Sequence, residues 1–216
     1  NNHGKLLRLG LYNLEGVVHH GMALNEAAVQ HMASVATGMQ LDSVKYYNME
    51  LSTESPDFYP ILTALLNEMV FFTGTYPLYH STLYSNDIFK NTFIARSSSK
   101  VYSQIESNFD LILTYENLLA KEINKLELYS ENIENITKIK KTNSKISDYK
   151  KIILIKTIET QKGLANNAVT TNVTIKSKQI LSLISQKWIR RNSDLGDVIT
   201  SKHNYSIYEN GYRTKT

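Results

Sequence analysis

The chain has 216 residues and a formal net charge of +4, and it is long enough to bury a sizeable core. Hydrophobic residues make up 42% of it and charged residues 20%, which excludes the composition of a disordered chain. It contains no cysteine, so disulfides, thiolate zinc sites and cysteine nucleophiles are all excluded.

Residues 1–55 form the first region, which is rich in alanine and glycine and which we expect to be helical. The chain begins without methionine and without a signal-peptide pattern, so we expect a processed or incomplete start. Over Leu11–Met39, apolar residues recur at approximately helical spacing, with glycines between them. Glycine weakens an isolated helix but lets neighbouring helices approach closely. The pattern predicts a packed helical pair.

The residues of metal-ligand type in this region are His19, His20, His31 and Asp42. Steps of eleven residues from His20 to His31 and on to Asp42 would place these three on one face of a continuous helix. They would then lie about three turns apart, which is too far to share one ion. We therefore expect surface or partner-contacting histidines, with no metal and no cofactor, unless the chain folds back on itself.

Residues 56–90 form the second region, which opens with the helix breakers Pro56 and Pro60. The following run, Ile61–Tyr79, has nineteen residues and a single charge, Glu68. That length can cross a hydrocarbon core of ~30 Å, but an acidic residue near its middle costs about 2.5 to 3.5 kcal/mol. Two interpretations stay open, a membrane-associated helix and a buried core helix. The residues that define the membrane segment in the first interpretation are Leu66, Met69, Val70, Phe71, Phe72 and Tyr76.

Residues 91–192 form the third region, which has no proline and no glycine before Gly163. Both residues terminate helices, so their absence predicts long uninterrupted helix. Apolar residues recur at every seventh position and mark one face, the heptad stripe, which another helix has to cover. The stripe consists of Ile105, Ile112, Leu119, Leu126 and Ile133. The second seam is incomplete, which favours a helix lying against larger partners, with an ordinary bundle helix as the alternative.

Charge is divided along this third region. Between Glu106 and Glu134 seven acidic residues stand against two lysines, whereas Lys138 to Arg191 has thirteen lysines or arginines against two acidic residues. This asymmetry can steer the basic part of the chain to an acidic protein, an anionic lipid or a nucleic acid. The basic part has only Tyr149 and Trp188 as aromatics, which disfavours nucleic acid.

The end of the chain is less regular in pattern. The segment Gly163–Thr174 contains β-branched residues, so we expect a weak point in the helix there, with room for a short strand. The tail, residues 193–216, is expected to be irregular. The sequence as a whole predicts a mostly α, elongated subunit with one marginal membrane-associated helix and a long stalk-like helix. No phosphate-binding loop, dinucleotide motif or nucleophile elbow is present, so we expect no enzymatic activity.

One stretch carries a family resemblance. The element Leu66-Asn67-Glu68, the apolar run after it and "FKNTFIARSSSKVYSQIE" resemble the b subunit of F-type ATP synthases, especially those encoded in mitochondrial genomes of plants and protists. In that family a small residue and an arginine, here Ala95 and Arg96, form the junction before a long peripheral-stalk helix. The resemblance covers about Leu66–Phe109. The apolar run is more polar than a usual span of this family, and some sixty-five residues precede it.

The resemblance implies a non-catalytic subunit of the inner mitochondrial membrane that anchors the catalytic head. Its implied partners are the proton-channel subunit, the oligomycin-sensitivity-conferring subunit and the head subunits. Two other hypotheses follow from the residues alone. The first is a soluble or periplasmic helical-bundle interaction module of the secretion-system accessory type, in which Ile61–Tyr79 is core and the heptad stripe closes onto the chain's own helices. The second is a basic nucleic-acid-binding helical protein.

Overall fold

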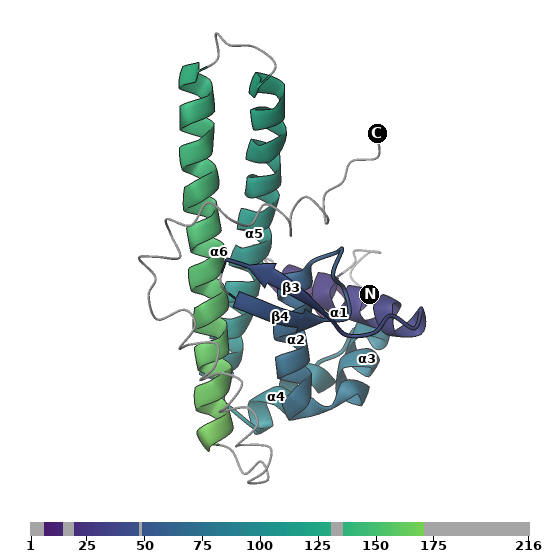
Figure 1. Ribbon diagram of the computed structural model, residues 1–216. Coiled ribbons are helices and arrows are strands. Elements are labelled where there is room, and N and C mark those ends of the chain that lie inside the picture. The colour runs from purple at the N-terminus through teal and green to yellow at the C-terminus, as the bar shows by residue number, and fades with distance from the viewer. Residues whose placement is uncertain (1–6, 15–19, 48, 131–135, 171–216) are drawn as a thin grey trace.

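The structure, a computed structural model, describes residues 7–14, 20–47, 49–130 and 136–170. These residues are mostly helical, which confirms the predicted fold class. A helical head carries two long antiparallel helices, α5 and α6, whose far ends stand clear of it (Figure 1). The elements in chain order are β1 (Arg8–Leu9), β2 (Tyr12–Asn13), α1 (Met22–Ala36), β3 (Asp42–Tyr46), β4 (Met49–Thr53), α2 (Pro60–Thr73), α3 (Thr75–Tyr84), α4 (Ile88–Ala95), α5 (Ser99–Ser130) and α6 (Ile136–Thr170).

The predicted helical pair over Leu11–Met39 is wrong in its first half. Strands β1 and β2 form a small antiparallel hairpin that ends within this stretch, and α1 is its only helix in the part that the structure describes. The reason lies in the glycines, because Gly10 turns the hairpin at φ 57° and Gly21 precedes α1 at φ 80°, both with left-handed backbones. A Cβ atom at Gly10 would lie 2.2 Å from Oδ1 of Asn25 on α1, and one at Gly21 would lie 2.8 Å from the Leu11 carbonyl oxygen. These glycines therefore provide both conformational freedom and a close approach to neighbouring segments. Asp110 of α5 then accepts hydrogen bonds from the N–H groups of Gly21 and Ala23, at 3.1 and 3.0 Å, and so caps α1.

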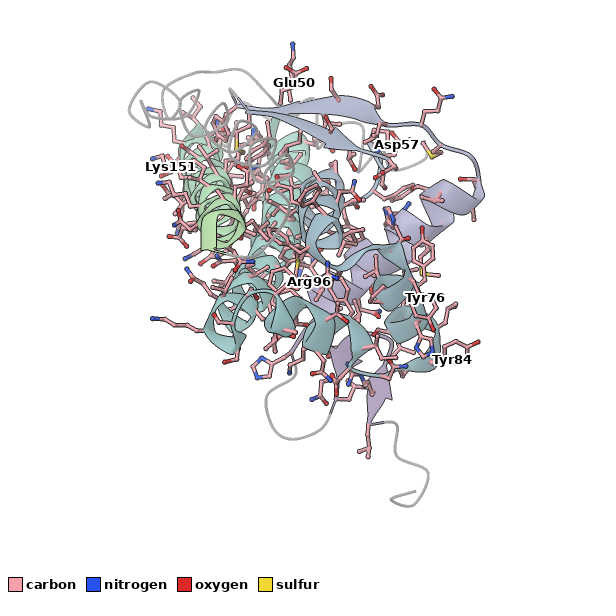
Figure 2. All side chains as sticks on the ribbon, turned by 90° about the horizontal axis from the view of Figure 1, so that it is seen from below. Glu50, Asp57, Tyr76, Tyr84, Arg96 and Lys151 are labelled. Atoms are coloured by element: carbon pink, nitrogen blue, oxygen red, sulfur yellow. The ribbon has the colours of Figure 1, made fainter. Side chains whose placement is uncertain are left out.

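Strands β3 and β4 form a second antiparallel hairpin that the sequence analysis missed. Their register runs from Asp42 opposite Thr53 to Tyr46 opposite Met49. Side chains of β4 alternate strictly between buried and exposed, which is the period of a strand with one face on a core. Glu50 lies on the outer side of this hairpin, away from the helices (Figure 2).

The apolar run Ile61–Tyr79 is divided between two helices. Helix α2 begins after Tyr59, with Pro60 in its first turn, and it ends at Gly74, whose φ of 80° stops the helix before α3 begins. Helix α2 packs against α1, β4, α4 and α6 in the middle of the head. Among the residues assigned to the membrane segment, Leu66, Met69 and Phe72 are buried, Val70 is half-buried, and Phe71 and Tyr76 are exposed. No helix in the described part of the chain combines the length and the apolar character that a membrane crossing needs.

Helices α5 and α6 have 32 and 35 residues and pack against each other along their length. The heptad stripe lies on the packed side of α5: Ile105, Ile112 and Leu119 are buried and Leu126 is half-buried. Ile133 lies outside the described residues. The predicted weak point is wrong as far as the structure describes it, because α6 continues through Gly163 to Thr170. Residues 171–174 and the tail 193–216 lie outside the described residues.

Candidate functional site

One polar cluster, which we call the His31 cluster, joins four elements of the head. His31 of α1 is only 4% exposed. Its Nε2 atom lies 3.4 Å from the Tyr79 hydroxyl of α3, and its Nδ1 atom lies 3.6 Å from Oε2 of Glu54, just after β4. Asn67 of α2 donates a hydrogen bond to the same Glu54 oxygen. Four separate segments thus meet around one imidazole ring.

The local sequence explains why this ring is buried. Ala27 and Ala28 lie one turn before His31 on the same face of α1, and both are fully buried. Their small side chains let α1 approach α2 closely, so the imidazole has to face protein groups rather than water. Among the described residues, His31 Nδ1 and the Ser34 hydroxyl one turn later are buried without a hydrogen-bond partner.

The chemistry of the His31 cluster favours a structural tie over catalysis. Burial, and then the charge of Glu54, raise the pKa of Tyr79, so this phenol stays protonated at neutral pH. A protonated phenol can donate to a histidine but is a poor nucleophile. The cluster holds α1, α3 and the middle of α2 in place.

Glu68 lies at a different contact, between α2 and α6. Its Oε1 atom accepts a hydrogen bond from Nε2 of Gln161 at 3.1 Å. Its Oε2 atom is buried and has no hydrogen-bond partner. Burial raises the pKa of Glu68 to about 7, and the bond from Gln161 opposes that shift only in part. The residue that the sequence analysis treated as an obstacle to membrane insertion is therefore a buried acid at a helix contact.

A third group surrounds Tyr59, which the sequence analysis did not single out. Tyr59 has a left-handed backbone at φ 49°, and its carbonyl accepts the N–H of Thr63 in the first turn of α2. Burial, and then the charges of Glu26 on α1 and Glu116 on α5, raise its pKa. The only sequence signal was the Tyr-Pro step, which restricts the backbone before a helix.

The described residues of metal-ligand type, His20, His31 and Asp42, do not share a helix. His19 lies outside the described residues, and His20 precedes α1 in an isolated bridge to Asn13. Asp42 begins β3 and is exposed, and His31 is enclosed by its own cluster. In the residues that the structure describes, no group of three or more metal-ligating side chains is placed to hold an ion.

The predicted junction ties two helix ends together. Ala95 is the last residue of α4, and Arg96 follows it. The Arg96 guanidinium donates to the carbonyl oxygen of Phe72 near the end of α2. A cation at a helix C-terminus satisfies a free carbonyl and opposes the helix dipole, so Arg96 stabilises the turn between α4 and α5.

The contact between the acidic helix α5 and the basic helix α6 includes an ion pair between them. Glu122 of α5 is buried and pairs with Lys125 at 2.7 Å and with Lys145 of α6 at 3.6 Å. The hydrogen bond from Lys125 is the main cause that lowers the pKa of Glu122. The Tyr115 and Tyr149 rings lie 5.6 Å apart in the same contact. The acidic and basic helices are thus partners of each other.

The far end of these two helices, which we call the distal hairpin, is more exposed. Leu128 near the end of α5 and Ile136 at the start of α6 are 68% and 55% exposed. Lys138, Lys140 and Lys141 follow in the first turns of α6 and are also exposed.

Comparison of the chain with models of known protein families, with curated proteins and with solved structures finds no match.

Proposed function

We propose that this chain is a non-catalytic helical interaction module, in which the head holds a projecting hairpin that binds an acidic protein. The observation that carries the proposal is the exposed pair Leu128 and Ile136 beside exposed lysines on the distal hairpin. Apolar side chains rimmed by charge are typical of protein-binding surfaces. The hypothesis of a helical-bundle interaction module agrees with a core that contains Leu66, Met69 and Phe72.

The lysines support a partner because local helix stability does not explain them. Lys138 lies in the first turn of α6, where the helix dipole disfavours positive charge, and Lys140 and Lys141 follow in the second turn. Lys138 lies 5.6 Å from the centre of the Tyr129 ring, and among the described residues the other two lysines have no such aromatic contact. The lack of further interleaved aromatics favours an acidic protein over a nucleic acid.

The test compares co-purification by the full chain and by two variants. We expect Leu128→Gln combined with Ile136→Gln to lose its specific partner, whereas Leu41→Gln keeps it. Leu41 is 63% exposed but lies in the head, before β3, so it is a matched control. Binding that weakens with added salt would support an acidic partner. Equal retention by both variants would refute the role of the distal hairpin.

A peripheral-stalk subunit of a mitochondrial ATP synthase, at the inner membrane, is a second candidate. The observation that favours it is the length of α5, which begins at Ser99 just after Ala95 and Arg96 and runs for 32 residues. The return of α6 along α5 makes the first candidate the better one. Recovery of ATP synthase head subunits with the chain in mild detergent would support the stalk, and their absence from a set that contains another specific partner would refute it.

A further inference from the structure

The outward face of α6, opposite its contact with α5, carries charges of opposite sign at equal distances on either side of Ile155. Its members, which we call the outer face of α6, are Asp148, Lys151, Ile155, Glu159 and Lys162. Relative to Ile155 they lie at positions −7, −4, 0, +4 and +7, which share one helix face. Ile155 is 40% exposed, while the neighbouring Ile153 and Leu154 are buried on the other side.

The order of charge is complementary to itself in one orientation only. If a second α6 runs antiparallel about Ile155, Asp148 meets Lys162 of the second copy and Lys151 meets its Glu159. Symmetry repeats both pairs, so four ion pairs flank a central contact between two Ile155 side chains. In a parallel arrangement every charge would meet its like. Charge complementarity therefore selects both the partner and its direction.

We propose that the outer face of α6 binds the same face of a second copy of this chain, antiparallel and with two-fold symmetry about Ile155. The face is open in the described structure, because Asp148, Ile155 and Lys162 are exposed and Lys151 and Glu159 are half-buried. The hydrogen bonds from α6 to α2 and β3 use Gln161 and the Lys150 carbonyl oxygen, neither of which belongs to this face. Figure 2 shows Lys151 on the outside of α6. The inference goes beyond the proposed function, because it uses the middle of α6 rather than the distal hairpin.

The ion pairs already present on this face do not oppose the dimer. Lys151 lies 3.7 Å from Asp148 and Lys156 lies 2.8 Å from Glu159, each within one turn of α6. Exposed pairs of this kind contribute little to stability, so exchanging them for pairs across the interface is nearly neutral. With one apolar contact at its centre, the interface lies below the standard size, and we expect association at micromolar concentrations or above.

Cross-linking of single-cysteine variants tests the geometry, because the natural chain has no cysteine. Two-fold symmetry brings the two copies of position 155 together, so Ile155→Cys should be cross-linked by a short bis-maleimide. Ser144 is exposed on the same side of α6, but its two copies would lie 22 residues apart along the axis, about 33 Å. Ser144→Cys alone should therefore give no cross-link, and mixed with Asn166→Cys it should give a cross-linked heterodimer.

Equal cross-linking of Ile155→Cys and Ser144→Cys would overturn the proposal, since it indicates random collision or a parallel pair. The absence of cross-linked Ile155→Cys at 100 μM protein would overturn it as well. The distal variant Leu128→Gln with Ile136→Gln should cross-link at position 155 as well as the parent does. This result separates failure of the dimer from failure of the proposed function.

A charge exchange measures the contribution of the ion pairs. Lys151→Glu or Glu159→Lys alone places like charges opposite each other twice per dimer, and we expect the association constant to fall about tenfold. The double variant restores opposite charges across the interface, and we expect recovery to within about threefold. It also places like charges next to Asp148 and Lys156 within each chain, so a purely structural effect would not be rescued. Sedimentation equilibrium gives the constants, and equal association by all four proteins would overturn the proposal.

Discussion

Replacing Glu68 by glutamine should change how the stability of this protein depends on pH. The Glu68 carboxyl is buried between α2 and α6, where its Oε2 atom has no partner and its pKa is about 7. Below pH 4.5 the group is protonated in both the folded and the unfolded chain. Between pH 4.5 and about 7 the unfolded chain releases the proton while the folded chain keeps it. The free energy of unfolding therefore falls as pH rises through this window, and the loss is constant above it.

The size of the effect follows from the two pKa values. A rise from 4.5 to about 7 at 1.36 kcal/mol per pKa unit sets an upper bound of about 3 kcal/mol. Glutamine keeps the carbonyl oxygen that accepts from Gln161 and cannot ionise. Its new amide donors replace an oxygen without a partner, at a cost of about 1 kcal/mol that is equal at all pH values. We therefore expect the Glu68→Gln variant to be the less stable protein near pH 4.5 and the more stable one above pH 7.

Urea unfolding followed by far-ultraviolet circular dichroism from pH 4 to 8 measures this difference. The matched control is Asp57→Asn, which removes an exposed carboxylate from the loop before α2 (Figure 2). We expect the control to follow the natural protein across the whole range. Parallel curves for the natural protein and Glu68→Gln would refute the buried-acid assignment, because the difference between them isolates this one group.

Three further variants test other parts of the fold. Asp110→Ala removes the acceptor of two N–H groups at the start of α1 and should lower the free energy of unfolding by about 1 to 2 kcal/mol, measured by urea unfolding at pH 7; an unchanged midpoint would show that water replaces the cap. Ile112→Ala, at a fully buried position of the heptad stripe, should cost about 2 to 5 kcal/mol, whereas Leu128→Ala should stay within about 0.5 kcal/mol. Equal losses of stability in the two variants would show that Ile112 is not part of the hydrophobic core. Gly74→Ala forces a side chain into φ 80° and should cost about 1 kcal/mol or more by thermal unfolding, while a gain would show that α2 and α3 can join.

The candidate site was only partly visible in the sequence. His31 stood out as a residue of metal-ligand type and Asn67 as part of the Leu66-Asn67-Glu68 element, but nothing in the sequence connected either of them with Glu54 or Tyr79. They are 13 to 48 residues away from their partners in the chain and meet only after α1, α2 and α3 have packed. The same holds for Asp110, which caps a helix 87 residues before it. Such contacts depend on tertiary structure, so no local sequence pattern predicts them.

The sequence by itself determined the long helix α5 and its buried face. Periodicity and the absence of helix breakers are local properties, so they predict α5 and the heptad stripe directly. The glycines of the first region were ambiguous, because the same residue serves close packing and left-handed turns, and only the structure shows that Gly10 and Gly21 serve both. What covers the stripe was also decided by tertiary structure, since a buried face requires a partner but does not specify whether that partner is the chain's own α6 or another molecule.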